Sequence, residues 1–329
     1  MSEAPLPAIG VGSPLGYGIR PTELVSYARA AEDAGLDDVS MGELRGTEVF
    51  SLASAVVAAT QRVRVETSIV AAVTRAPPLI AMAAATLSQL SGGRFRLGIG
   101  AGSPIVAGWH GVDFESPLRL VEHSIDMVRA ALAGERLIEY GNFRLAEEMV
   151  GDVPIILSAM NMRMVELAGR KADGVILQFC GPEQAATMDD LARRARRASG
   201  NDSPFEVMVN VWAFAGDDVA AAEERFRQEI GPYLAVPTYR SAAVALSSEE
   251  EVDAAAAAWR AGGRNAAAEA VPQGLVDQLL FVLGAEDPRP RLAEFARNGC
   301  SRVRFVPLTM RHGDSAHANA VIAAVAGLR

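Results

Sequence analysis

The chain has 329 residues and a formal charge of −9, with 40 acidic against 31 basic residues. This balance argues against a nucleic-acid partner, which needs a basic face for the phosphate backbone. The longest apolar stretches, Ser51–Thr60 and Ala318–Leu328, fall short of the roughly 20 residues that cross a bilayer, and no secretion signal opens the chain. Two cysteines are too few for a disulfide framework or a four-ligand zinc site, so we expect a cytoplasmic protein without a metal centre.

Short apolar runs alternate with longer amphipathic patterns along the chain. Most of the runs are continuously apolar, as in parallel strands that are buried on both faces. We predict eight strands, at Ala8–Val11, Asp38–Met41, Val63–Val70, Phe95–Ile99, Val153–Leu157, Gly174–Leu177, Phe205–Phe214 and Ser301–Val306. Helices are predicted at Pro21–Ala34, Glu48–Thr60, Pro78–Leu90, Leu118–Ala133, Met162–Lys171, Pro182–Ala198 and Ser315–Ala326. This alternation predicts an α/β fold, a closed (β/α)8 TIM barrel, with an open doubly wound sheet as the alternative.

Two segments depart from this alternation. Residues 135–150 follow the fourth helix and contain the turn signal Tyr140-Gly141-Asn142, which predicts a small hairpin insertion. Residues 217–299 are too long for one helix and are broken by glycine and proline, which predicts an extended helical segment between strands seven and eight. We expect a single barrel domain over residues 1–329, with this extra segment over the active-site face.

A glycine-rich run after the fourth strand is similar to a dinucleotide-binding loop but fails its pattern. Gly98 and Gly100 have the required spacing, but Ser103 stands at the third glycine position. Pro104 follows, so we expect no helix to open there at once. The glycines still indicate a close approach of the backbone to another group.

The carboxyl ends of barrel strands carry the functional residues of such folds. The residues at these ends include Ser13, Glu43, Ser68–Thr74, Ala101–His110, Ser158–Asn161 and Gln178. Glu43 is the only acid among them, which makes it a catalytic candidate together with His110, although a surface carboxylate is the alternative. Trp109 beside His110, with Gln178, suits the rim of a substrate site, and a packed tryptophan is the alternative. Asn161 suits a helix cap whose free N–H groups form an anion site.

Two strings of residues have a specific order and spacing. The first is TLSQLSGGRFRLGIG at 86–100, preceded by Arg75 and Pro77-Pro78. The second is VPIILSAMN at 153–161, followed by LAG at 167–169 and ADG at 172–174, and the run AAEDAGLDDV at 30–39 fits with them. Together they resemble the signatures of the luciferase-like (bacterial luciferase superfamily) flavin and deazaflavin oxidoreductases. The pattern is most similar to the coenzyme F420-dependent branch related to methylenetetrahydromethanopterin reductase.

This resemblance implies a barrel, often dimeric, that holds coenzyme F420 (a 5-deazaflavin) or FMN in its mouth. It implies a non-proline cis peptide at Ser68-Ile69 beneath the middle ring, and a phosphate at residues 158–161. The residues that it assigns to cofactor binding are Ser13, Glu43, Ser68, Ile69, Ala71, Gly100, Ser103, Ser158, Ala159, Met160 and Asn161.

The chain departs from relatives that carry an acid–histidine pair after strand two. The acid corresponds to Glu43, but Leu44 stands at the histidine, and Ala101 stands where some relatives carry a second acid. Oxidation of an alcohol would need a base that the sequence does not identify. Reduction of a C=N or C=C bond by hydride transfer is therefore favoured, since it depends more on positioning than on a strong base.

We therefore expect an F420-dependent oxidoreductase that acts on a small-molecule substrate as a homodimer, without nucleic-acid or membrane partners. The first alternative is a reduced-FMN-dependent luciferase-like monooxygenase. The second is a non-catalytic flavin-binding or partner barrel. An unrelated barrel hydrolase is the third, and only Glu43 and two histidines support it.

Overall fold

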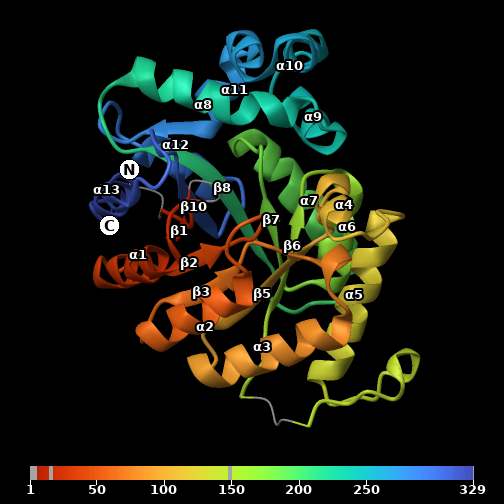
Figure 1. Cartoon of the computed structure of the whole chain (residues 1–329). Coiled ribbons are helices and arrows are strands. Elements are labelled where there is room, and N and C mark those ends of the chain that lie inside the picture. The colour runs from red at the N-terminus through yellow and green to blue at the C-terminus, as the bar shows by residue number, and fades with distance from the viewer. Residues whose placement is uncertain (1–5, 15–17, 147–149, 329) are drawn as a thin grey trace.

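The computed structural model describes residues 6–14, 18–146 and 150–328, and eight parallel strands close into a barrel at its centre (Figure 1). The barrel strands are β1 (Ala8–Gly12), β2 (Asp38–Met41), β3 (Arg64–Thr67), β5 (Phe95–Gly100), β6 (Ile155–Ala159), β7 (Gly174–Leu177), β8 (Glu206–Phe214) and β10 (Arg302–Pro307). They follow one another in chain order, and β10 pairs with both β1 and β8. This closure confirms the TIM-barrel prediction and excludes the open sheet.

Helices cover the outside of the barrel (Figure 1). The ring contains α1 (Pro21–Asp33), α2 (Val49–Ala59), α3 (Pro77–Ser91), α5 (Pro117–Leu132), α6 (Met162–Lys171), α7 (Pro182–Ala198), α12 (Arg289–Arg297) and α13 (Ser315–Ala326). Pro21 and Pro77 occupy first helical positions, where the missing N–H costs no helical hydrogen bond. Gly92 follows α3 with a φ of 63°, a left-handed conformation that glycine adopts without strain.

Strand three is broken where the sequence over Val63–Val70 predicts one continuous strand. The Ser68-Ile69 peptide is cis, as the family resemblance implies, and it separates β3 from the two-residue strand β4 (Val70–Ala71). Strand β4 pairs with the last two residues of β5, so the chain bulges at the end of the barrel. Hydrophobic periodicity does not reveal this break, because residues that favour strands, such as Val65, Thr67 and Val70, lie on both sides of it.

Most of the structure that is additional to the barrel strands and their ring of helices connects β8 to β10. It comprises α8 (Val219–Leu234), α9 (Pro237–Val244), α10 (Glu249–Ala270) and α11 (Gln273–Leu279), which stack at the top of Figure 1, followed by α12. The segment is not wholly helical, because β9 (Leu280–Val282) extends the sheet beside the upper part of β8. Its apolar core includes Phe179 and Leu308, which follow β7 and β10, so the helices cover the carboxyl ends of these strands.

The predicted hairpin after α5 is smaller than a regular hairpin. A single antiparallel bridge joins Leu137 to Phe143 around a 3-10 turn, η2 (Ile138–Tyr140). His123 of α5 lies 3.1 Å from the Tyr140 hydroxyl and ties the turn to the barrel. Residues 147–149 of the predicted insertion lie outside the described residues.

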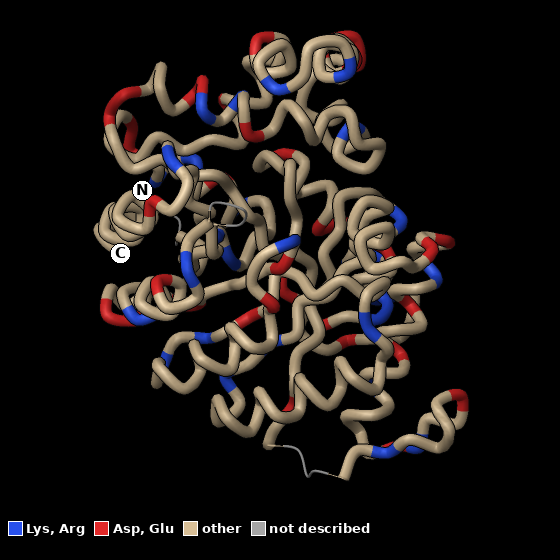
Figure 2. Tube along the Cα trace, viewed as in Figure 1, with Lys and Arg blue, Asp and Glu red and all other residues tan. Residues whose placement is uncertain are grey.

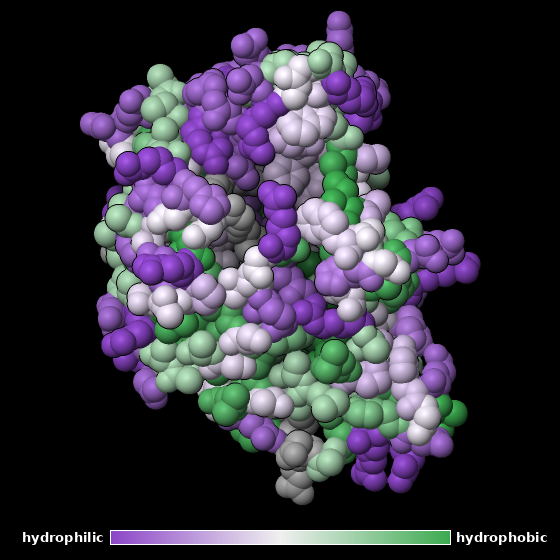
Figure 3. Space-filling view, in the orientation of Figure 1, coloured by the Kyte–Doolittle hydropathy of each residue, from purple (hydrophilic) through white to green (hydrophobic). Residues whose placement is uncertain are grey.

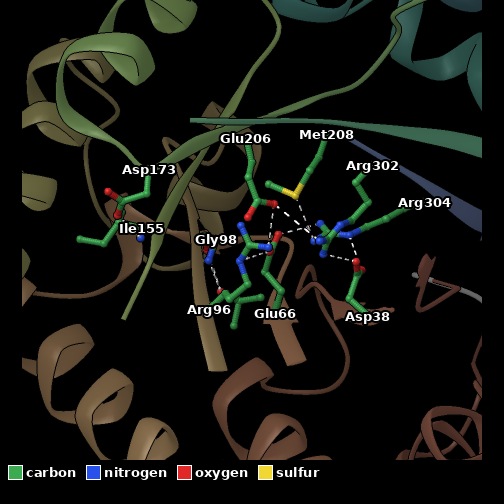
Figure 4. A network of polar contacts seen from close by, with 11 residues as sticks. Asp38, Glu66, Arg96, Gly98, Ile155, Asp173, Glu206, Met208, Arg302 and Arg304 are labelled. Carbon is green, nitrogen blue, oxygen red and sulfur yellow. Dashed lines mark hydrogen bonds and ion pairs between the residues drawn. The ribbon is translucent and has the colours of Figure 1, made fainter. Parts of the chain in front are cut away.

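The barrel interior has an apolar upper level and an ionic lower level. Ile156, Ile176 and Met208 pack together above, with Ile69 of the bulge against them. Below lies a network of three acids and three arginines, namely Asp38, Glu66, Glu206, Arg96, Arg302 and Arg304 (Figure 4). Opposite charges balance within it, so the barrel buries paired ions and not a net charge.

The two central acids share Arg304. Its Nε lies 2.6 Å from Asp38 Oδ1, and its Nη1 lies 2.6 Å from Glu66 Oε1. Burial lowers the pKa of Arg304, but the two carboxylates raise it more, so the net shift is upward. The guanidinium therefore stays charged at physiological pH.

On the outer surface, positive and negative residues lie side by side over several of the visible helices, whereas α2 and α3 contain neither (Figure 2). Within the described ranges, no helix is long and apolar enough to cross a membrane. The same residues hold no group of three histidine, cysteine or acidic side chains arranged to bind a metal ion.

Candidate active site

The bulge after β3 and the end of β5 form the floor of the barrel mouth. A methyl group added at Gly100 would stand 3.2 Å from Ile69 Cδ1 and 3.5 Å from Ser158 Cβ. One added at Gly102 would stand 3.1 Å from Ala71 Cβ. The two glycines therefore let the bulge approach β5 closely. Four of the residues that the resemblance assigns to the cofactor are thus brought together.

Asn210 of β8 supports this floor from across the barrel. Its Nδ2 donates to Ser68 Oγ over 3.3 Å, next to the cis peptide. Its side chain is buried, and its Oδ1 has no hydrogen-bond partner in the described part of the chain. A buried amide oxygen without a hydrogen-bond partner lowers the stability of the folded state. This atom is therefore a candidate acceptor for a hydrogen bond from a bound ligand. The sequence analysis missed Asn210, although a polar side chain within a buried strand is an informative signal.

Glu43 follows β2 and is bound by Arg75, which follows the bulge. Both terminal nitrogens of Arg75 donate to the carboxylate, and Nη2 lies 2.8 Å from Glu43 Oε2 and 2.8 Å from Glu48 Oε1. The N–H of Val49 at the start of α2 also donates to Glu43. Burial lowers the pKa of Arg75, but its two carboxylate partners raise it more. Glu43 therefore has a cationic partner, Arg75, although Leu44 and not a histidine follows it.

A short helix opens directly after the glycine-rich run, which corrects the expectation that none would. Helix α4 (Pro104–Trp109) begins with proline at its first position, and Ser103 caps it by accepting a hydrogen bond from the N–H of Val106 over 3.2 Å. Trp109 is 51% exposed, and His110 at the helix end is exposed too. Both side chains are thus open to solvent at the predicted rim.

The end of β6 leads into the start of α6. Asn161 caps this helix, as predicted, and its Oδ1 accepts from the N–H of Met164 over 3.0 Å. The N–H groups of Met162 and Arg163 in the first turn have no acceptor within the helix, so they suit an anion. Ser158 and Ala159 belong to β6 itself, whereas Met160 packs against the apolar core of the insertion.

A cluster of aromatic side chains, called the aromatic wall here, joins the ends of β7 and β8 to α8 and α9 within the apolar core of the insertion. The ring of Phe179 lies 5.3 Å from that of Trp212 and 5.4 Å from that of Tyr239, and the rings of Tyr233 and Tyr239 are 4.8 Å apart. Phe179 has a φ of 51°, which is unusual for a bulky residue, and half-buried Gln178 precedes it. Burial raises the pKa of both tyrosines, so their hydroxyls are neutral at physiological pH. The sequence analysis missed this wall because α8 and α9 contribute two of its rings.

Two buried hydroxyl side chains complete the mouth near β1 and β10. Ser13 follows β1, and its N–H donates to the carbonyl of Ser40 over 2.7 Å. Thr309 follows β10, and its Oγ1 lacks a partner among the residues described. Figure 3 shows the molecule hollowed between the insertion helices at the top and the barrel below.

These features define a TIM-barrel protein with a candidate ligand site at the carboxyl ends of its strands. The sequence profile of the luciferase-like monooxygenase family matches residues 7–302. The chain therefore belongs to this family.

Individual relatives refine the comparison. A Mycobacterium tuberculosis protein provisionally named a coenzyme F420-dependent oxidoreductase is 32% identical, over 88% of this chain and 92% of the relative. The 5,10-methylenetetrahydromethanopterin reductase of Methanolobus tindarius is 31% identical over 63% of this chain and 65% of its own. The solved F420-dependent tetrahydromethanopterin reductase of Methanopyrus kandleri superposes with a TM-score of 0.78, covering 97% and 98% of the two chains. At 17% identity, that last match shows the fold alone.

Proposed function

We propose that the chain is a coenzyme F420-dependent oxidoreductase that transfers a hydride between C5 of the deazaflavin and a small organic substrate. The observation that carries the proposal is the floor of the mouth, where Ile69 of the bulge packs against Gly100. It offers an apolar platform for a planar ring, beneath the aromatic wall. The relative named as F420-dependent matches nearly the whole chain, which supports the same cofactor.

The residues present fit this cofactor. Ile69 and Ala71 would support its ring, and the unpaired Oδ1 of Asn210 offers an acceptor beneath the mouth. The first turn of α6, with Ser158 before it, would receive the phosphate. When it is bound there, coenzyme F420 supplies a hydride donor or acceptor at C5 of its ring. The protein's part is to orient the two reactants.

Reduction of a C=N or C=C bond is the favoured reaction. Glu43 is the acid that the sequence analysis identified in the mouth. Its carboxylate accepts hydrogen bonds from Arg75 and from the N–H at the start of α2. Leu44 and Ala101 supply no acid–base group. A polarised double bond takes a hydride at one atom and a proton, which water can deliver, at the other. Alcohol oxidation would instead require a base beside the hydroxyl.

A reduced-FMN monooxygenase is the second candidate function. The description of the matching family profile favours it, since it names monooxygenases. A non-catalytic barrel that binds flavin or a protein partner is the remaining alternative, and a turnover assay tests it.

We place the protein in the cytoplasm and propose that it works as a homodimer on a small molecule. Both cysteines, Cys180 and Cys300, are unpaired and buried, which suits a reducing compartment. Burial raises the pKa of Cys180 to about 12, so this thiol is unreactive.

Turnover with defined substrates tests the proposal. Reduced F420 and the protein are mixed with a cyclic imine or with cyclohexenone, and oxidised F420 is followed by its fluorescence. In a parallel reaction, propan-2-ol is supplied with oxidised F420. We expect the imine or the enone to react at least ~10-fold faster than the alcohol. Oxygen consumption with reduced FMN, and no F420 turnover, would favour the monooxygenase.

A further inference from the structure

The inward face of β8 changes in character from the bottom of the barrel to its mouth. Alternate side chains of a strand share one face. Glu206 on this face accepts a hydrogen bond from Arg96 inside the barrel over 3.0 Å. Asn210 on the same face donates to Ser68 Oγ over 3.3 Å. Trp212 follows about 7 Å further along the strand and is only partly buried, so its indole stands inside the mouth, one level above the floor.

Two rings hold Trp212 in this position. The ring of Phe179 lies 5.3 Å away and that of Phe226 lies 5.4 Å away, with interplanar angles of 83° and 69°. Edge-to-face contacts of this kind favour one orientation of the indole. Phe226 belongs to α8 and is fully buried. The position of Trp212 is thus set by the insertion as well as by the barrel.

The apolar core of the insertion has a partly exposed edge. The large side chains that pack against this core but keep part of their surface accessible include Met160, Trp212, Tyr233 and Tyr239. Met160 follows β6 and Trp212 lies in β8, whereas the two tyrosines belong to α8 and α9. The edge therefore joins the barrel to the insertion, and Figure 3 shows a hollow between these two parts. Accessible aromatic surface beside a hollow is typical of a site for a small molecule.

The arginines on the helices of the two tyrosines are already paired with acids. Helices α8 and α9 carry three arginines, and the pairs are Arg225 with Glu229 over 3.0 Å, Arg227 with Glu223 over 3.6 Å and Arg240 with Glu249 over 2.8 Å. Residues 217–299 contain no lysine. A phosphate or carboxylate group placed at this edge would lose its hydration without gaining an unpaired cation from these helices. The edge therefore disfavours an anionic substrate.

We propose that the substrate of the hydride transfer is an uncharged molecule with an aromatic ring, and that this ring binds against Trp212, Tyr233 and Tyr239. The inference rests on the proposed function, because it names the class of molecule that the deazaflavin would reduce. The floor at Ile69 and Gly100 would support the cofactor, and Trp212 stands one level above it. A substrate ring against the indole would lie over the cofactor. Its reduction consumes one hydride from reduced F420 and one proton from water.

The tyrosine hydroxyls narrow the class further. Burial raises the pKa of both Tyr233 and Tyr239, so each is a neutral phenol that can donate a hydrogen bond. A carbonyl oxygen or an imine nitrogen accepts such a bond, whereas an ammonium group does not. The proposed class therefore comprises aromatic enones and cyclic imines fused to an aromatic ring.

Three enones that differ in one substituent test the proposal. They are 4-phenylbut-3-en-2-one, pent-3-en-2-one, which has a methyl group in place of the phenyl ring, and the phenyl enone with a carboxylate at the para position. Oxidation of reduced F420 is followed by fluorescence. The value of kcat/KM for the phenyl enone should exceed that for the methyl enone at least ~10-fold, because the ring gains apolar contacts. It should exceed that for the carboxylate by at least ~10-fold as well, because the charge is buried without a cation.

Variants locate this selectivity. Trp212→Leu should lower the ratio of phenyl to methyl enone to less than ~3, whereas Tyr239→Phe keeps the ring and should keep the ratio. Trp259→Leu is the matched control, since Trp259 is also partly buried but belongs to α10, at the top of Figure 1. This control should keep the ratio. Circular dichroism of every variant reports whether the fold is intact.

The outcomes separate this proposal from the proposed function. Turnover of F420 with equal kcat/KM for the phenyl and methyl enones, or an unchanged ratio in folded Trp212→Leu, would overturn the substrate class and leave the F420-dependent activity standing. If no enone oxidises F420, the proposed function fails, and equilibrium dialysis of the same compounds then decides on the binding surface. The phenyl enone should bind at least ~10-fold more tightly than its carboxylate, and Trp212→Leu should remove this difference. Equal binding of the two would overturn the proposal.

Discussion

The contacts of single residues in the mouth indicate their roles, which their positions in the sequence alone do not. Glu43 and Arg75 are both prominent in the sequence, but their contact depends on how the chain turns back after the bulge. Once paired, the Glu43 carboxylate joins the loop after β2 to the start of α2 and to Arg75. We therefore favour an anchoring role for Glu43 over that of a proton donor.

Substitution of Glu43 separates these roles. Glu43→Gln should lower the free energy of unfolding by about 1–3 kcal/mol, because it weakens a half-buried ion pair. It should change kcat by less than ~3-fold, since the mouth keeps its shape. Thermal denaturation and steady-state kinetics measure the two effects. The control is Glu48→Gln, whose side chain is 45% exposed and should matter less. A ~100-fold loss of kcat with unchanged F420 affinity would instead identify Glu43 as the acid.

The close approach at Gly100 gives a second prediction at this scale. Gly100→Val should displace Ile69 and Ser158, and so raise the dissociation constant for F420 at least ~10-fold. Fluorescence titration measures it, and circular dichroism checks the fold. Gly108→Ala in α4 is the control, because a methyl group there meets nothing within 4 Å. Unchanged affinity of the Gly100 variant would remove the bulge from the cofactor site.

At the scale of elements, hydrophobic periodicity predicts the regular strands and helices but does not predict the short or interrupted ones. The continuous apolar runs predicted the barrel strands because parallel strands are buried on both faces. The bulge at Ser68-Ile69 came only from the family resemblance, because residues that favour strands flank it on both sides. Helix α4 was missed because Pro104 suggested a break, although proline also suits a first helical position. Strand β9 is three residues long, too short for any period to appear.

The ionic lower level of the barrel was also missed, because charged residues are expected outside. Arg304→Met tests its contribution. The substitution leaves Asp38 and Glu66 buried with fewer partners, so the free energy of unfolding should fall by about 3–5 kcal/mol. Urea denaturation measures it. Arg289→Met, at an exposed ion pair, should change it by less than ~0.5 kcal/mol. Equal effects of the two substitutions would contradict a structural role for the network.

The same network predicts how stability depends on pH. Burial raises the pKa of Asp38, but Arg304 and Arg302 lower it more, so the net shift is downward. The folded state then holds its proton more weakly than the unfolded state, whose carboxyl has a pKa of ~3.9. Stability from Asp38 is thus complete above pH ~4 and is lost as the pH falls further. Urea midpoints between pH 7 and pH 3 should show this loss, and it should be smaller in Arg304→Met. A flat profile would contradict the shift.

Across the whole molecule, the ionic level and the candidate site occupy opposite ends of one barrel. The paired charges fill the amino-terminal half, whereas the mouth is framed by the bulge, α4, the start of α6 and the insertion. The family signatures named the residues of the bulge, of β5 and of β6, since these lie within or close to the matching strings. They did not name Asn210 or the aromatic wall. Those residues follow β7 or belong to β8 and the insertion, where no signature extends, and only folding brings them together.

The most direct test of the account is a comparison of cofactor affinities. The purified protein is titrated separately with F420 and with FMN, and binding is followed by the fluorescence of each cofactor. Because the mouth offers a ring platform and an anion site in a chain similar to an F420-dependent relative, we predict a micromolar or lower dissociation constant for F420 and at least ~10-fold weaker binding of FMN. Equal or tighter binding of FMN would contradict the central claim.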